Sequence, residues 1–102
     1  MTRLALAIDK NHPAFAGHFP GFPIFPGAAL LDLVLHAVLS SRGIEFKGWQ
    51  IASAKFLDMV RPGDEPYVEF QVPNPGLIRF SVHVGERQVA SGTLAKTALP
   101  LA

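Results

Sequence analysis

The chain has 102 residues, 49% of them hydrophobic, and its 9 Lys and Arg nearly balance 8 Asp and Glu. This length suits one domain, residues 1–102, with one buried core, and the near-neutral charge argues against a nucleic-acid binder. Because cysteine is absent, a disulfide scaffold, a thiol nucleophile and a cysteine zinc site are excluded. The N-terminal apolar run is too short for a signal peptide. The most apolar segment, 26–39, is shorter than the ~20 residues that span a bilayer, so we expect a soluble cytoplasmic domain.

The spacing of apolar residues predicts a strand, a proline-rich loop, a helix and then four more strands. We expect strands at residues 3–9, 49–60, 67–72, 77–84 and 87–96, and the helix at residues 26–41. Apolar and polar residues alternate along the third and fourth of these strands, as they do on a sheet with one buried face. Turns rich in proline and glycine separate the strands. We therefore expect the last four strands to form a meander in a mostly antiparallel sheet, which is the α+β class.

The helix carries two polar residues in an otherwise apolar stretch. From Ala28 to Leu39 every residue is apolar except Asp32 and His36. A helix that is apolar all round is typically buried, so the sheet should wrap it. Asp32 and His36 are four apart and share one face. A buried carboxylate needs a partner or a proton, and Asp32 is either a structural residue bonded to a backbone N–H or to His36, or a functional acid.

The loop before the helix, GHFPGFPIFPG, is too rigid and too apolar for an ordinary surface loop. It runs from Gly17 to Gly27 with His18 near its start. At Gly27 a helix start offers unpaired N–H groups and a positive dipole to a developing oxyanion. A base, an acid and an oxyanion donor would meet in one apolar pocket, which suits proton abstraction next to a carbonyl. A lone histidine more often satisfies a loop carbonyl, but the combination favours function. The expected lining is Phe19, Phe22 and Phe25.

These residues form a pattern that resembles a known enzyme family. The stretch HPAFAGHFPGFPIFPGAALLD is similar to the signature of the β-hydroxyacyl-acyl-carrier-protein dehydratases of the FabA/FabZ type. In that signature an acid follows the histidine by fourteen residues, and Asp32 follows His18 at that distance. Downstream, AKFLDMVRPGDEPYVEF resembles the family's strand, P-G-D turn and strand. The resemblance implies a hotdog fold, an antiparallel sheet of about five strands wrapped round one central apolar helix.

The resemblance also implies roles for individual residues. His18 would remove the α-proton of a β-hydroxyacyl thioester carried on acyl carrier protein. Asp32 would protonate the departing β-hydroxyl, so that water leaves and a trans-enoyl thioester remains. The Gly27 N–H would bind the thioester oxygen. The phenylalanines would keep the site dry and so raise the pKa of Asp32, and no metal or organic cofactor is needed.

The chain departs from the family pattern in two places. His36 stands where family members commonly have a glutamine that supports the acid, and it could hold Asp32 in a similar way. By comparison with FabZ-like enzymes, we also expect the chain to begin later, without their N-terminal helix and first strand. These departures leave a second reading open: a non-catalytic hotdog subunit that binds acyl chains or partners another dehydratase-like chain. A hotdog thioesterase ranks lower, because those enzymes lack the H-F-P-G loop.

The expected partners are acyl carrier protein and further subunits. The resemblance implies that two chains pair edge to edge into a twofold dimer, in which His18 of one chain works with Asp32 of the other. A homodimer or larger assembly is expected, and a heterodimer is an alternative. The carrier-protein surface is acidic, so its candidate docking residues are cationic, although each is as readily an ordinary solvated charge. They are Lys55, Arg61, Arg79 and Arg87.

Overall fold

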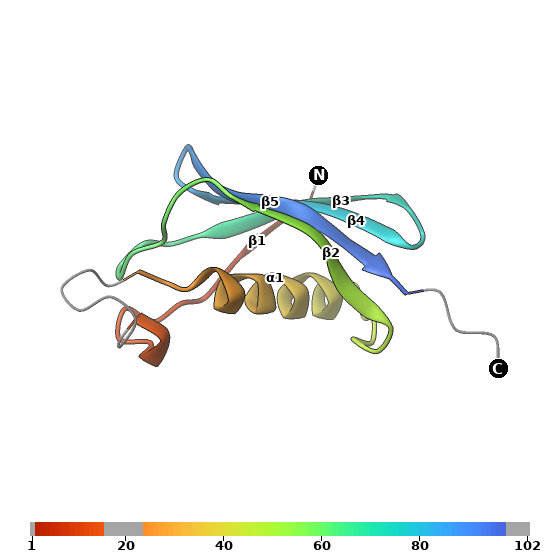
Figure 1. Cartoon of the computed structure of the whole chain (residues 1–102), viewed down its shortest axis with the longest axis horizontal. Helices are drawn as coiled ribbons and strands as arrows, with labels where there is room; N and C mark the ends of the chain where they lie inside the picture. Colours follow the sequence, from red (N-terminus) through yellow and green to blue (C-terminus); the bar gives the residue numbers. More distant parts are fainter. Residues whose placement is uncertain (1, 16–23, 98–102) are drawn as a thin grey trace.

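The computed structural model describes residues 2–15 and 24–97 of the chain. Within that part, one curved sheet lies over a single α-helix (Figure 1). The elements are β1 (Thr2–Ala5), η1 (Pro13–Phe15, a 3-10 helix), α1 (Gly27–Ser41), β2 (Trp49–Phe56), β3 (Tyr67–Asn74), β4 (Leu77–Val84) and β5 (Arg87–Lys96). None of the helices in these described ranges is long and apolar enough to cross a membrane. The α+β class and the five antiparallel strands are as the sequence predicted.

The order of the strands differs from the predicted meander. The sheet runs β1-β3-β4-β5-β2, and every pair is antiparallel. Only β3, β4 and β5 form a meander, because β2 pairs with β5 and β1 takes the free edge of β3. The cause is the connection from β2 to β3, residues 57–66, which is longer than the 2–5 residues of a hairpin loop. Its first N–H groups, of Leu57 and Asp58, bond to the Val89 carbonyl of β5.

The core lies between α1 and the face of the sheet that it covers. Leu30, Val34 and Val38 recur every four residues, so they form one stripe of the helix, and all three are buried. Alternate residues of the sheet meet them, as the two-residue periodicity predicted. The buried sheet residues are Val68, Phe70, Ile78, Phe80, Val82, Val89, Ala90 and Leu94. Each fully buried side chain of this size contributes roughly 1.5–3 kcal/mol.

The opposite side of α1 stays open to solvent. Ala28, Asp32, His36 and Ser40, again four residues apart, are all exposed. We call this line of residues the open stripe. The expectation that the helix is buried all round is therefore wrong for one chain, because a single sheet has only one face to offer and covers only one side of α1.

Gly92 in β5 lies where a side chain has no room. A Cβ at this position would overlap the Ser53 carbonyl oxygen of β2 and lie 2.8 Å from Cζ of Phe80. The ladder between β2 and β5 shifts register between Ile51 and Ser53, next to this contact. Gly92 therefore lets the two backbones approach where the sheet is irregular.

We predict that Gly92→Ala lowers the free energy of unfolding by about 2 kcal/mol, because the added methyl forces backbone and ring apart. Gly76→Ala is the matched control, since its Cβ would have no neighbour nearer than 4.0 Å, and it should change stability by less than about 0.5 kcal/mol. Urea unfolding of both variants measures the difference. Equal stabilities would contradict the close approach at Gly92.

Candidate functional site

A hollow of about 390 Å³ opens beside the first turn of α1. Its walls come from the end of the proline-rich loop, the start of α1, the end of β2 and the segment that follows. They are Ile24, Phe25, Gly27, Ala28, Leu30, Phe56, Asp58 and Met59. The first bond within the helix runs from the Leu30 N–H to the Pro26 carbonyl, at 3.0 Å. The N–H groups before it have no partner within the helix, so the hollow lies at the positive end of the helix dipole.

Phe25 and Pro26 explain why the helix starts at this point. Pro26 is the N-cap with φ −60° and ψ 141°, an extended conformation that ends the loop and leads into the helix. Phe25 is buried, and its ring packs edge-on against Phe15 and His12, with centroids 5.3 and 5.1 Å away. Its N–H donates to the Val60 carbonyl at 2.7 Å. The end of the loop is thus anchored both in the core and on the segment after β2.

Gly27 is in close contact with an aromatic ring. A Cβ on Gly27 would lie 2.6 Å from Cζ of Phe56, so only glycine lets the ring rest on the first turn. Phe56 itself is 50% exposed. The N-terminus of α1 therefore meets a mostly apolar, partly open surface, to which Asp58 adds a carboxylate.

Asp32 and His36 contact one another on the open stripe. His36 Nδ1 donates to the Asp32 carbonyl oxygen at 2.8 Å and lies 3.5 Å from Asp32 Oδ1. The His36 ring also rests against Phe46, with centroids 4.3 Å apart. These contacts fix the imidazole beside the carboxylate, yet the Asp32 side chain is 68% exposed. The dry environment expected for Asp32 is therefore not supplied by one chain.

One chain does not bring Asp32 to the hollow. Asp32 is not among the residues that line the hollow. The structure thus places Phe25 and Gly27 at the hollow. Asp32 and His36 lie together farther along α1, on the open stripe whose first residue, Ala28, does line the hollow. His18, Phe19 and Phe22 lie outside the described residues.

Six residues of the hollow were not predicted as site residues, and three of them come from the end of β2 and the segment after it: Phe56, Asp58 and Met59. The sequence predicted a strand from 49 to 60, but β2 ends at Phe56. The signal was the run FLDMV, in which the alternation of apolar and polar residues breaks down. A break of this kind indicates that a strand has ended and that the next side chains follow a different surface.

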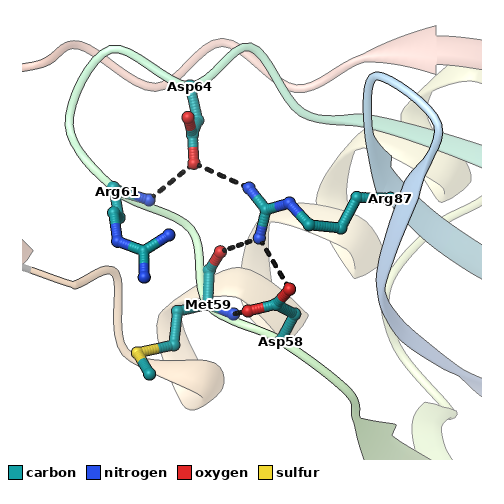
Figure 2. Close-up of polar contacts among 5 residues, drawn as sticks. All are labelled: Asp58, Met59, Arg61, Asp64 and Arg87. Carbon is teal, nitrogen blue, oxygen red and sulfur yellow. Dashed lines mark hydrogen bonds and ion pairs between the residues drawn. The ribbon is translucent and has the colours of Figure 1, made fainter.

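Arg87 also has a different role from the one expected. Its guanidinium bonds to the Met59 carbonyl at 2.8 Å and contacts Asp58 Oδ2 at 3.1 Å and Asp64 Oδ2 at 3.3 Å (Figure 2). These contacts hold the guanidinium inside the fold's own network, so Arg87 does not offer a free cation for docking. The other three candidate cations, Lys55, Arg61 and Arg79, are exposed.

The network at Arg87 predicts acid sensitivity. The Met59 N–H, and after it the Arg87 guanidinium, hold the pKa of Asp58 below its ordinary value of 3.8. A carboxyl whose pKa is lowered by folding adds stability above its unfolded pKa, and that stability is lost as the pH falls through the folded value. Asp58→Asn should therefore lower the free energy of unfolding at neutral pH and flatten its decline below about pH 3.8. Urea unfolding of wild type and variant from neutral pH into this acid range measures both effects. Parallel plots of stability against pH would contradict the assigned role of Asp58.

Relatives of known function are 3-hydroxyacyl-[acyl-carrier-protein] dehydratases named FabZ. The protein from Levilactobacillus brevis is 36% identical, and the match covers 85% of this chain and 66% of that protein. The Wolbachia pipientis protein is 34% identical, and the match covers 86% of this chain and 69% of that protein. A Haemophilus influenzae protein is 38% identical, and the match covers 64% of this chain and 49% of that protein. The chain thus spans about half to two thirds of the length of these relatives.

Comparison with solved structures shows the fold, and a family profile shows the family. The dehydratase heterocomplex ApeI:P from Xenorhabdus doucetiae superposes with a TM-score of 0.75 at 24% identity, over 94% of this chain and 86% of that one. The fluoroacetyl-CoA-specific thioesterase FlK superposes with a TM-score of 0.67 at 17% identity, over 93% and 88%. Likeness to both a dehydratase and a thioesterase shows the hotdog fold and not the chemistry. The profile of the ApeI-like proteins, described as ApeI dehydratase, matches residues 1–93, and the chain belongs to this dehydratase family, among relatives of FabZ.

Proposed function

We propose that the chain is a β-hydroxyacyl-acyl-carrier-protein dehydratase, a carbon–oxygen lyase. The observation that carries the proposal is Gly27, which follows the GHFPG loop and sits at the open first turn of α1 in an apolar hollow. His18 takes the α-proton, and the electrons of that C–H bond form the α,β double bond. The β-hydroxyl leaves with the proton of Asp32 as water. The product is a trans-enoyl thioester, made in fatty-acid or related acyl-chain synthesis.

Gly27 supports this reaction through charge. As the α-proton leaves, negative charge develops on the thioester oxygen, and a fixed N–H group at a helix start stabilises it more in the transition state than in the substrate. Phe25, with Phe19 and Phe22 from the same loop, would exclude water from the reacting atoms. Water exclusion strengthens the N–H to oxygen interaction, because the local dielectric constant falls.

We propose that two chains complete the site, with His18 of one chain and Asp32 of the other. Asp32 lies on the open stripe and does not itself line the hollow of its own chain, and a second subunit would cover it. β2 is an edge strand of the sheet, and its residues 52–56 are all exposed. Such edges are normally covered or paired, which supports pairing of two chains along β2. Phe56, Leu57 and Met59 are large apolar side chains that remain 50%, 46% and 44% exposed there.

The proposed setting is a single domain, residues 1–102, that acts in the cytoplasm as a homodimer or larger assembly. Acyl carrier protein is the proposed partner, and the exposed cations Lys55, Arg61 and Arg79 are the candidates for docking its acidic surface. The alternative is a non-catalytic subunit of a mixed dimer. It is favoured by one observation, that the Xenorhabdus doucetiae neighbour belongs to a dehydratase heterocomplex.

The direct test incubates the purified protein with β-hydroxyacyl carrier proteins of several chain types and follows the loss of one water by mass spectrometry. We expect turnover by wild type and almost none by Asp32→Asn, which keeps the shape but cannot donate a carboxylic proton. Ser40→Ala, on the same open stripe, is the control and should keep full activity. Equal turnover by wild type and Asp32→Asn would refute the assigned acid. Turnover only after a second dehydratase-like chain is added would support the alternative.

Mixed dimers test whether the site is shared. His18→Ala and Asp32→Ala should each be nearly inactive alone. When the two variants are unfolded and refolded together, about half the dimers are mixed, and each mixed dimer has one site with both mutations and one with neither. Activity should therefore recover to about a quarter of wild type. No recovery, with subunit exchange confirmed by mass spectrometry, would reject the shared site.

His36 is proposed to support Asp32, because its ring is fixed beside the carboxylate. His36→Gln keeps a hydrogen-bonding side chain and should retain substantial activity, whereas His36→Leu keeps only the apolar bulk and should lose much more. Steady-state kinetics of both variants, at matched thermal stability, measures the contrast. Two equally small losses would leave His36 with a structural role only.

A further inference from the structure

Arg87 ties the two ends of one connection together. It is the first residue of β5, and its side chain is 34% exposed. Its guanidinium contacts Asp58 and Met59 near the start of the β2–β3 connection and Asp64 near its end (Figure 2). Three acceptors that come from both ends of one segment suit the planar fork of an arginine, whose five N–H groups are fixed in one plane.

The bonded segment is closed on itself as well. Asp64 Oδ2 accepts the Arg61 N–H at 2.9 Å, and the Asp64 N–H returns to the Arg61 carbonyl at 3.0 Å. Asp58 Oδ1 accepts the Met59 N–H at 2.8 Å. Each carboxylate thus uses one interaction to shape its own backbone and another to hold Arg87. The guanidinium locks a turn that is already formed and does not create it.

This segment is a wall of the candidate site. Asp58 and Met59 line the hollow beside α1. Between them and the turn, buried Val60 accepts the N–H of Phe25, and Phe25 is the last residue of the loop before the N-cap. A shift of residues 58–60 would therefore move both the wall of the hollow and the end of the loop that carries His18.

We propose that Arg87 is a positioning residue that fixes residues 58–60 and, through the Phe25–Val60 hydrogen bond, the geometry of the hollow at the start of α1. The effect of Arg87 on activity rests on the proposed function. Its effect on the position of Phe25 does not, because that effect depends only on the contacts that hold Phe25 in place. Arg87 is far from the start of α1 in sequence. It would act there through two successive contacts, first with residues 58 and 59 and then through the Phe25–Val60 hydrogen bond.

Hydrogen exchange of the backbone amides, followed by NMR, tests the positioning directly. Arg87→Met removes the guanidinium and keeps the apolar stem. It should speed exchange of the Phe25 amide about fivefold or more relative to the Val82 amide of β4, an effect in the range of exposed ion pairs. Arg87→Lys can satisfy fewer of the acceptors and should fall between. Arg3→Met is the matched control, because Arg3 pairs with Glu69 at 2.6 Å on the β1 edge and lies over Tyr67.

The control should leave the ratio of Phe25 to Val82 exchange unchanged. An unchanged ratio in Arg87→Met, or the same change in Arg3→Met, would overturn the proposal. Should Arg87→Met fail to fold, Asp58→Asn weakens the same network and is measured by the same exchange ratio.

A second experiment measures catalysis. With β-hydroxyacyl carrier proteins as substrates, kcat/KM should fall in the order wild type, Arg87→Lys, Arg87→Met. Inactivity of wild type would refute the proposed function, and the exchange ratio alone would then decide whether Arg87 positions Phe25. A changed exchange ratio with unaltered kcat/KM would refute only the effect of Arg87 on catalysis.

Discussion

The packing of one face of α1 against the sheet determines where the candidate functional residues of the helix lie. Val34 and Val38 are fully buried beneath the sheet, and their spacing fixes the rotation of the helix about its own axis. Once that rotation is set, the first turn faces the end of β2 and the open stripe faces solvent. The hollow and the exposed Asp32 are both consequences of this one contact.

The same constraint separates the components of the proposed chemistry. Asp32 lies five residues beyond Gly27, more than one turn along α1, and it does not line the hollow at the first turn. The proposed second subunit would cover the Asp32 carboxylate, which one chain leaves 68% exposed. The exposed apolar residues around the end of β2, Phe56, Leu57 and Met59, are a cost to a lone chain and a benefit to a pair.

Local patterns predicted the parts of the fold that local forces determine. The limits of β4 and β5 agree with the alternation in the sequence, and α1 begins one residue after the predicted start. The pairing of β2 with β5 was not predictable in this way, because alternation shows which residues face the core and not which strand lies alongside. Likewise the internal role of Arg87 depends on Asp58 and Asp64, which are distant in sequence and meet only in the folded chain.

The central proposal is that Asp32 works in a site completed by a second subunit. A crystal structure of the assembled protein tests this directly, through the distances from His18 to the Asp32 of its own chain and to the partner's Asp32. The account predicts that the partner's Asp32 is the nearer and that assembly buries its carboxylate. A nearer Asp32 in the same chain, or a carboxylate as exposed in the assembly as in the single chain, would contradict it.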